Sequence, residues 1–164
     1  MSVSVSYESK VNTVETITTS VPAISSANNS VTHDGYNTSD RLTATTTPPA
    51  TKCAYMLKAL SGGAATIDLT DLIGANGVTV DGTGLKVQVM KFKASTGNAN
   101  AITVTFGASN PYALKGASFA FDLKAGQEDT FYANDATPDI SALACEIDLS
   151  GTGSQSLQVS IVMG

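Results

Sequence analysis

One histidine, two cysteines and three pairs of neighbouring carboxylates are the residues of this chain that could support chemistry. His33 is the only histidine, so a Ser-His-Asp or Cys-His arrangement would have to use it. It lies in the segment 31–37, inside a Ser/Thr-rich stretch where a fixed imidazole is hard to build. We therefore expect His33 to be a turn or docking residue and not a catalytic base.

The carboxylates do not form a recognisable catalytic or metal-binding pattern. The pairs are Asp68 with Asp71, Glu128 with Asp129, and Asp135 with Asp139. A glycosidase needs two facing carboxyl groups, usually with aromatic platforms for the sugar, but the chain has no Trp and only 6% aromatic residues. No spacing matches the calcium loop of an EF-hand, and zinc would require more His or Cys. We interpret these residues as solvated loop carboxylates and charges at sheet edges.

Glycine-rich segments do not indicate a phosphate site either. Gly82-Thr83-Gly84 and Gly151-Thr152-Gly153 are predicted turns, and both lack the following helix that a phosphate site requires. The sequence therefore names no catalytic, cofactor-binding or metal-ligating residue, and it predicts a protein that is not an enzyme.

The two cysteines, Cys53 and Cys145, lie far apart and show neither CxxC nor a His partner spacing. Each falls on an alternating apolar phase, Cys53 with Tyr55 and Cys145 with Ile147. Because free cysteine packs as a small hydrophobic residue, we predict that both are buried free thiols and that they do not form a disulfide.

Composition limits the classes of partner. A length of 164 residues suits one domain, or one domain with an extended arm. The net charge of −5 argues against binding to nucleic-acid phosphates. No apolar stretch approaches the length of a membrane span, and the first ten residues lack the basic and apolar regions of a secretory signal. We expect neither a nucleic-acid nor a membrane partner.

Residues 1–50 differ from the rest of the chain. Nineteen of these fifty residues are Ser or Thr, and the large apolar residues are isolated from one another. A stretch this poor in apolar residues cannot close a core alone. It is either a disordered leader or an ordered, extended N-terminal arm that lies on its own domain or on a neighbour. We adopt the second interpretation, with residues 51–164 as the body.

The body has the alternating pattern of strands. Leu85–Phe106 is predicted to be a β-hairpin with a Gly/Asn turn at residues 95–100, because Ile102, Val104 and Phe106 alternate with threonines. A change of apolar phase after Val89 predicts a bulge or a strand that swaps faces. The segment 70–73 is predicted to be a single helical turn.

The alternation continues to the last strand, Leu157–Met163, which carries no charge. Such a strand is safe from aggregation only if it is central in its sheet or covered by a partner. About eight strands without a helical period predict an all-β fold, a jelly-roll-like β-sandwich with an extended N-terminal arm. We also predict a homo-oligomer, with a trimer as the expected form.

Several phrases of the sequence carry a resemblance to a known class. They are VTHDGYN (31–37), TPPATK (47–52), TIDLTDLIGANG (66–77), VDGTGLKVQ (80–88), NANAITVTFGASN (98–110) and SGTGSQSLQVSIV (150–162). Together with the Ser/Thr-rich arm, they resemble structural proteins of tailed bacteriophages, the small capsid decoration or cement proteins in particular. The resemblance implies a jelly-roll body, oligomeric assembly, and an arm that contacts the capsid shell or a neighbouring copy. The expected partners are the major capsid protein and further copies of the chain, and the expected location is the capsid surface of the virion, after synthesis in the host cytoplasm.

A second hypothesis is a carbohydrate- or receptor-binding β-sandwich module of a phage fibre. Sugar platforms require exposed Trp or Tyr, and the five tyrosines are scattered along the chain, which favours assembly over sugar binding. A small lyase or hydrolase is the third alternative.

Overall fold

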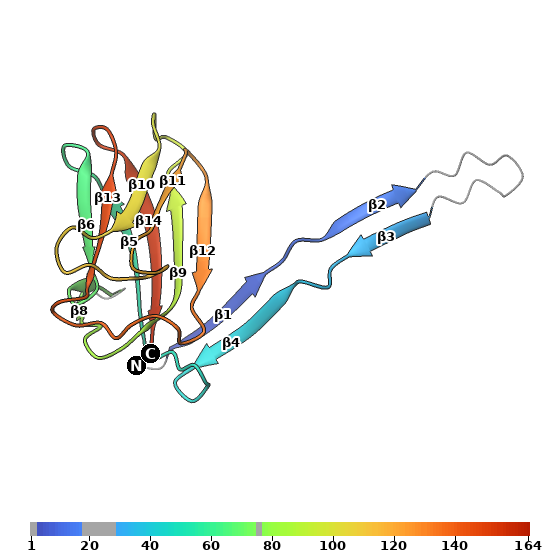
Figure 1. The fold of residues 1–164 in the computed structure, drawn as a ribbon, viewed down its shortest axis with the longest axis horizontal. Helices are drawn as coiled ribbons and strands as arrows, with labels where there is room; N and C mark the ends of the chain where they lie inside the picture. The colour runs from blue at the N-terminus through green and yellow to red at the C-terminus, as the bar shows by residue number, and fades with distance from the viewer. Residues whose placement is uncertain (1–2, 18–28, 75–76) are drawn as a thin grey trace, which may run out of the picture. The chain divides into compact units, whose positions relative to one another are not determined.

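The computed structural model describes residues 3–17, 29–74 and 77–164, and over these residues it contains strands and no helix. The predicted all-β class is confirmed. The chain forms two compact units (Figure 1): the segment Ser6–Arg41, which we call the ribbon, and Leu42–Gly164 with the residues up to Val5, which we call the body. The strands are β1 (Ser4–Ser9), β2 (Thr13–Ile17), β3 (Asn29–His33), β4 (Thr38–Thr43), β5 (Lys52–Ala59), β6 (Ala64–Asp68), β7 (Leu72–Ile73), β8 (Thr79–Val80), β9 (Val87–Ala94), β10 (Ile102–Phe106), β11 (Ala120–Leu123), β12 (Glu128–Tyr132), β13 (Glu146–Ser150) and β14 (Ser156–Met163).

Two four-stranded antiparallel sheets make up most of the body. One has the strand order β12-β9-β14-β5 and is called the β5 sheet below; the other has the order β11-β10-β13-β6 and is called the β6 sheet. Met90, Phe92 and Ile161 of the β5 sheet join Val104 and Ile147 of the β6 sheet in one cluster of buried residues. The body is therefore a β-sandwich whose core lies between the sheets.

The predicted hairpin over 85–106 is wrong. β9 pairs with β12 and β14, whereas β10 pairs with β11 and β13, so the two strands belong to different sheets. The turn residues between them cross from sheet to sheet and are held by Asn98, whose side chain donates to Ser156 O (2.9 Å) and accepts from Ser156 N (2.9 Å). Two consecutive strands that each have one apolar face can bury these faces against each other from opposite sheets of a sandwich. Their alternating pattern is the same as that of two strands paired in a hairpin, so the sequence does not distinguish the two arrangements.

The predicted irregularity is present as a bulge, but it lies at Gln88, before Val89 and not after it. Val162 of β14 lies opposite Val89 and the next residue, Met163, lies opposite Val87, so Gln88 is unmatched in β14. The extra residue shifts the in–out alternation of β9 by one position. Val87 therefore faces the core, as Met90 and Phe92 do. The Gln88 side chain is also buried, and its Nε2 donates to Asp135 Oδ1 at 3.0 Å.

The helical turn predicted at 70–73 is wrong as well. Leu72–Ile73 is β7, which pairs with β8. Asp68 Oδ1 accepts hydrogen bonds from Thr70 N (2.8 Å) and Thr70 Oγ1 (2.7 Å). Such a side-chain turn competes with helix formation, and it directs Leu72 into the core.

Both predicted Gly-Thr-Gly turns are present. Gly84 and Gly153 have positive φ angles of 76° and 79°, which favour glycine. A side chain on Gly82 would lie 2.6 Å from Leu69 O. Turn geometry and close backbone approach thus account for these glycines.

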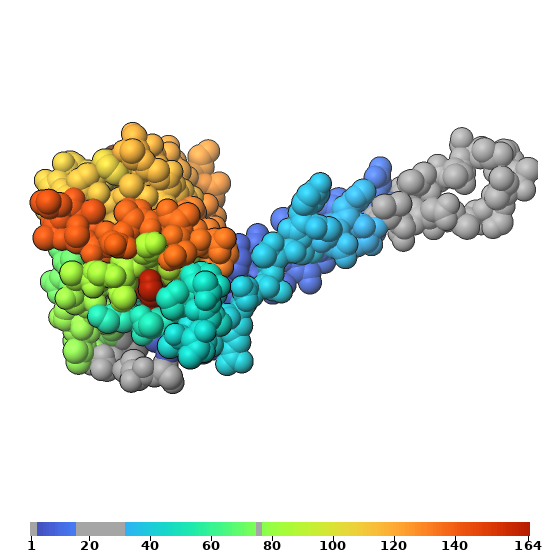
Figure 2. Space-filling model, turned by 60° about the horizontal axis from the view of Figure 1, so that its bottom comes forward, coloured from blue at the N-terminus to red at the C-terminus, as the bar shows by residue number. Residues whose placement is uncertain are grey.

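The uncharged last strand, β14, is central in the β5 sheet between β9 and β5. Its end is enclosed as well, because Gly164 N donates to Lys86 O (3.1 Å) and Lys86 N donates to Gly164 O (3.0 Å). Figure 2 shows the C-terminal residues as one small red patch surrounded by other segments of the body. An uncharged strand avoids aggregation if it is central in its sheet or covered by a partner, and β14 meets the first condition.

The ribbon consists of paired strands. β2 and β3 are antiparallel, from Thr13 opposite His33 to Ile17 opposite Asn29, and β1 pairs with β4. Residues 18–28 of the predicted arm lie outside the described residues. Leu42 and Ala50, from the segment 1–50, are buried in the body.

Candidate interaction surface

The residues singled out for chemistry are not brought together. Within residues 3–17, 29–74 and 77–164, no group of three or more His, Cys, Asp or Glu could hold a metal ion. His33 ends strand β3, opposite Thr13, with its Nε2 3.7 Å from Glu15 Oε2. Both side chains of this ion pair are exposed. The residue is part of a strand and not of a turn.

Each pair of neighbouring carboxylates contains members with structural contacts. Asp68 accepts hydrogen bonds from Thr70, Asp129 contacts the Lys115 ammonium, and Asp135 exchanges two hydrogen bonds with Gln88. These contacts fix turns and strand ends, and they do not create facing carboxyl groups.

Glu128 binds two lysines. Its carboxylate lies 3.2 Å from Lys91 Nζ and 3.6 Å from Lys93 Nζ. The hydrogen bond from Lys91, with the charge of that lysine, lowers the pKa of Glu128 below its ordinary value. The glutamate therefore offsets much of the positive charge that two lysines bring to one sheet face.

The cysteines differ from each other. Cys145 is buried, as predicted, and burial raises the pKa of its thiol. Cys53 is exposed, so the prediction for it is wrong; both thiols are free. The reason is the orientation of β5, whose inward side chains include Ala54 and Met56. Its other alternating set, which includes Cys53 and Tyr55, lies on the outer face of the β5 sheet.

The outer face of the β5 sheet can be described from its register. Residues opposite one another in neighbouring antiparallel strands lie on the same face. From β12 to β5, three rows cross this face: Glu128, Lys93, Gln158 and Leu57; Thr130, Lys91, Ser160 and Tyr55; and Tyr132, Val89, Val162 and Cys53. Charge is thus concentrated on β12 and β9, and exposed apolar side chains on β5.

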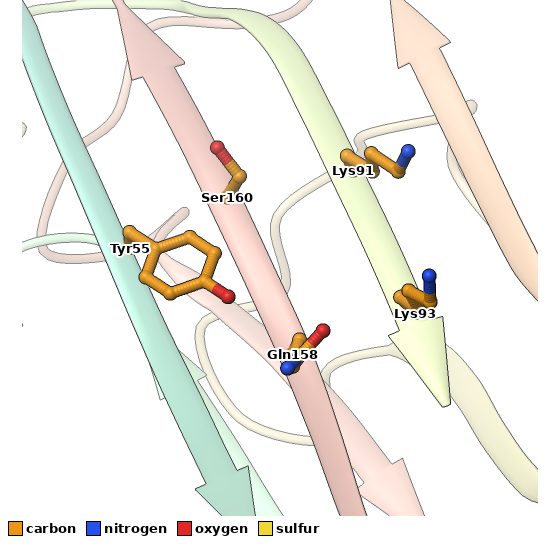
Figure 3. A pocket seen from close by; sticks show the side chains of 5 residues that line it. All are labelled: Tyr55, Lys91, Lys93, Gln158 and Ser160. Carbon is orange, nitrogen blue, oxygen red and sulfur yellow. The ribbon is translucent and has the colours of Figure 1, made fainter. Parts of the chain in front are cut away.

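A shallow depression of about 340 Å³ lies on this face, lined by Tyr55, Lys91, Lys93, Gln158 and Ser160. Figure 3 shows the Tyr55 hydroxyl directed toward β14 and Gln158, with the two lysine side chains over β9. The polar side-chain atoms of Tyr55, Gln158 and Ser160 make no hydrogen bond within the described parts of the chain. An aromatic ring beside an amide and a hydroxyl can bind a ligand or a protein surface. Among the described residues, no hydrogen bond joins the Ser160 hydroxyl to Lys91 or Lys93.

Sequence reasoning missed this surface because it assigned the wrong face of β5 to the core. Tyr55 and Leu57 are 63% and 64% exposed. In the sequence their alternating set is wholly apolar, whereas the inward set includes Lys58. No local signal could have reversed that choice, because long-range pairing with β14 decides it.

Comparison with known proteins gives no family assignment. No protein-family model matches the sequence, and no curated protein matches it significantly. Among the described residues, no helix is long and apolar enough to cross a membrane.

Proposed function

We propose that this chain is a non-enzymatic virion structural protein, a capsid decoration or cement protein that binds and stabilises a phage head shell. The observation that carries the proposal is the ribbon. An isolated two-stranded hairpin is marginally stable in water, and Ser6–Arg41 forms a unit of its own that is built of paired strands. A segment of this kind is stabilised when it lies on a partner surface.

The ribbon has the side chains for such a contact. Val11, Val14 and Tyr36 are large apolar residues with exposed fractions of 78%, 61% and 102%. Exposed apolar side chains along an extended element favour burial against another protein. The partners we propose are the major capsid protein and further copies of this chain, at the capsid surface of the virion.

We infer in addition that the body has jelly-roll topology. Numbered in chain order from β5, the eight strands of the sandwich follow the order first, eighth, third, sixth in the β5 sheet and second, seventh, fourth, fifth in the β6 sheet. This order, with two interleaved Greek keys, supports a jelly roll, an architecture that occurs in viral capsid domains.

The proposed function is tested by binding of the full-length protein to purified, undecorated capsid shells. A variant with Val11→Ser, Val14→Ser and Tyr36→Ser should bind at least tenfold more weakly, because each substitution removes apolar area that the contact would bury. Leu143→Ser, which removes an exposed apolar side chain of the body (80% exposed), is the matched control and should bind as the wild type does. Absence of wild-type binding to shells would remove the proposal.

The copy number remains a prediction. The uncharged last strand needs no partner copy to cover it, because β14 is central in the β5 sheet. A homo-oligomer stays part of the proposal, and its mass in solution distinguishes a trimer from other forms.

One observation favours a second candidate, a carbohydrate- or receptor-binding module of a phage fibre. The depression at Tyr55 combines an exposed ring with the free polar groups of Gln158 and Ser160, which is the chemistry that sugar binding uses. Binding of the full chain to host cell-surface glycans, lost in Tyr55→Ala and kept in Tyr36→Ala, would favour this candidate over decoration.

A further inference from the structure

The four edges of the two four-stranded sheets are not equally protected against pairing. β5 is eight residues long and carries no carboxylate, and its lysines, Lys52 and Lys58, stand near its two ends. The other three edge strands are shorter and contain Asp68, Asp122, and Glu128 with Asp129. Charged residues on an edge oppose addition of another strand. β5 therefore presents the longest uncharged run of any edge, the five residues from Cys53 to Leu57.

The backbone groups of Tyr55 and Leu57 point to the open side of β5. Leu60 N donates to Gln155 O (2.8 Å) and Ser95 N donates to Ser156 O (3.1 Å). Since hydrogen-bonded positions alternate in antiparallel pairs, even-numbered residues of β5 bond to β14 and odd-numbered residues face the edge. Among the described residues, no hydrogen bond from the open edge engages Tyr55 or Leu57.

Among the described residues, β7 and β8 lie against β5, and the flanking segments that line a depression meet the beginning of the strand. Thr51–Cys53 lies beside Thr79–Asp81 and Val3 around a depression of about 410 Å³. Lys52 Nζ also donates to Asp81 O at 2.5 Å. The open part of the edge is therefore the stretch that follows, residues 54–59.

A second copy of β5 is complementary to this stretch in one antiparallel register. With Met56 opposite Met56, Tyr55 lies opposite Leu57 on the outer face, and Lys58 lies opposite Ala54 on the inner face. With Tyr55 opposite Tyr55, Lys52 would lie opposite Lys58, and like charges in that position are destabilising. With Leu57 opposite Leu57, both Tyr–Leu pairs would be lost. The Met56 register overlaps residues 54–58, which fit within the open part of the edge.

We propose that β5 pairs antiparallel with β5 of a second copy, centred on Met56, so that two β5 sheets join into one across a two-fold axis. Tyr55 and Leu57 of each copy then exchange main-chain hydrogen bonds, and their exposed side chains pair across the new contact. This deepens the proposed function by naming the contact between copies. It is tested on the free protein, so its failure is separate from failure to bind capsid shells.

The first test is the mass of the full chain by native mass spectrometry and sedimentation at micromolar concentrations. We expect a dimer or an even-numbered assembly. Leu57→Lys places like charges at the contact and should raise the dissociation constant at least tenfold, while Leu143→Lys, the same change at an exposed position outside β5, should leave it unchanged. A wild-type monomer, a trimer, or an oligomer that Leu57→Lys does not weaken would overturn the proposal.

The second test reads the register directly, in a Cys53→Ser background. Residues opposite each other without mutual hydrogen bonds have Cα atoms about 4.5 Å apart, within the range of a disulfide. Under mild oxidation, Met56→Cys should form a covalent dimer, whereas Lys58→Cys, two residues along the same face, should not. Equal crosslinking of both variants, or crosslinking of Lys58→Cys alone, would contradict the Met56 register.

Discussion

The two outer faces of the sandwich differ in how completely their polar groups are paired. On the β6 sheet, Asp148 accepts hydrogen bonds from Thr66 Oγ1 (2.7 Å) and Ala108 N (2.8 Å), and Asp122 accepts one from Thr103 Oγ1 (2.7 Å). On the β5 sheet, the side-chain polar groups of Gln158 and Ser160 have no such contacts with the parts of the chain that the structure describes. On the outer face of the β6 sheet, the polar side chains satisfy one another's hydrogen-bonding groups. On the outer face of the β5 sheet, the side-chain groups of Gln158 and Ser160 remain available to bind a partner.

The faces also differ in charge and apolar exposure. The outer face of the β6 sheet carries Asp122, Asp148, Glu146 and Asp68, all acidic. The outer face of the β5 sheet carries Lys91 and Lys93 beside the exposed side chains of β5. Since exposed apolar side chains favour burial, we expect contacts to form on the β5 side of the body.

We expect the largest difference in unfolding free energy between substitutions on the inner face and on the outer face of β14. Val159 is fully buried and the adjacent Ser160 lies on the outer face. Val159→Lys buries an unpaired charge and should cost more than about 4 kcal/mol of unfolding free energy, while Ser160→Lys, which places an exposed charge opposite Lys91, should cost less than about 1 kcal/mol. Urea unfolding measures both. A comparable loss in the two variants would contradict the assignment of the faces.

The next effect compares the polar groups of the two outer faces. Asp148→Ala removes a charged acceptor from Ala108 N and Thr66, so we expect a loss of about 1–3 kcal/mol. Gln158→Ala removes a side chain that makes no hydrogen bond to the described residues, and the unfolding free energy should change by less than about 0.5 kcal/mol. If thermal unfolding shows a larger loss of stability for Gln158→Ala than for Asp148→Ala, the polar side chains of the β5 face are not the unpaired ones.

The two cysteines can be compared by their rates of chemical labelling, without measuring stability. Cys53 is exposed, whereas Cys145 is buried and has a raised pKa, so less of it is thiolate at neutral pH. Labelling of the native protein should modify one thiol quickly and the second only after unfolding, and Cys53→Ser should abolish the fast phase. Two slow thiols, or a fast phase that survives Cys53→Ser, would be the contrary result.

The sequence predicted elements whose pattern is local. Ile102–Phe106 and the last strand have one clearly apolar alternating set. Both are strands, and that set is buried except for the half-buried Phe106. It could not predict which strands pair, because the loop at 95–101 has the same turn residues whether it closes a hairpin or crosses between sheets. The depression was not predictable either, since Tyr55, Lys91 and Gln158 come from three strands far apart in the chain.

The smallest effect concerns Glu128, the charged group at the margin of the β5 face. Its pKa is lowered in the folded protein, mainly by the hydrogen bond from Lys91, so its favourable contribution is present above the ordinary glutamate pKa and is lost as the pH falls through the lowered value. Because the pair is exposed, the change in stability should be slight. The direct measurement is an NMR titration of the Glu128 carboxyl group, which should protonate below the ordinary value of about 4.3. Lys91→Gln should raise that pKa more than Lys93→Gln does, since Lys91 makes the shorter contact (3.2 Å against 3.6 Å). An unchanged pKa in Lys91→Gln would show that the lysines do not hold Glu128, and the charge we assign to the β5 face would then be underestimated.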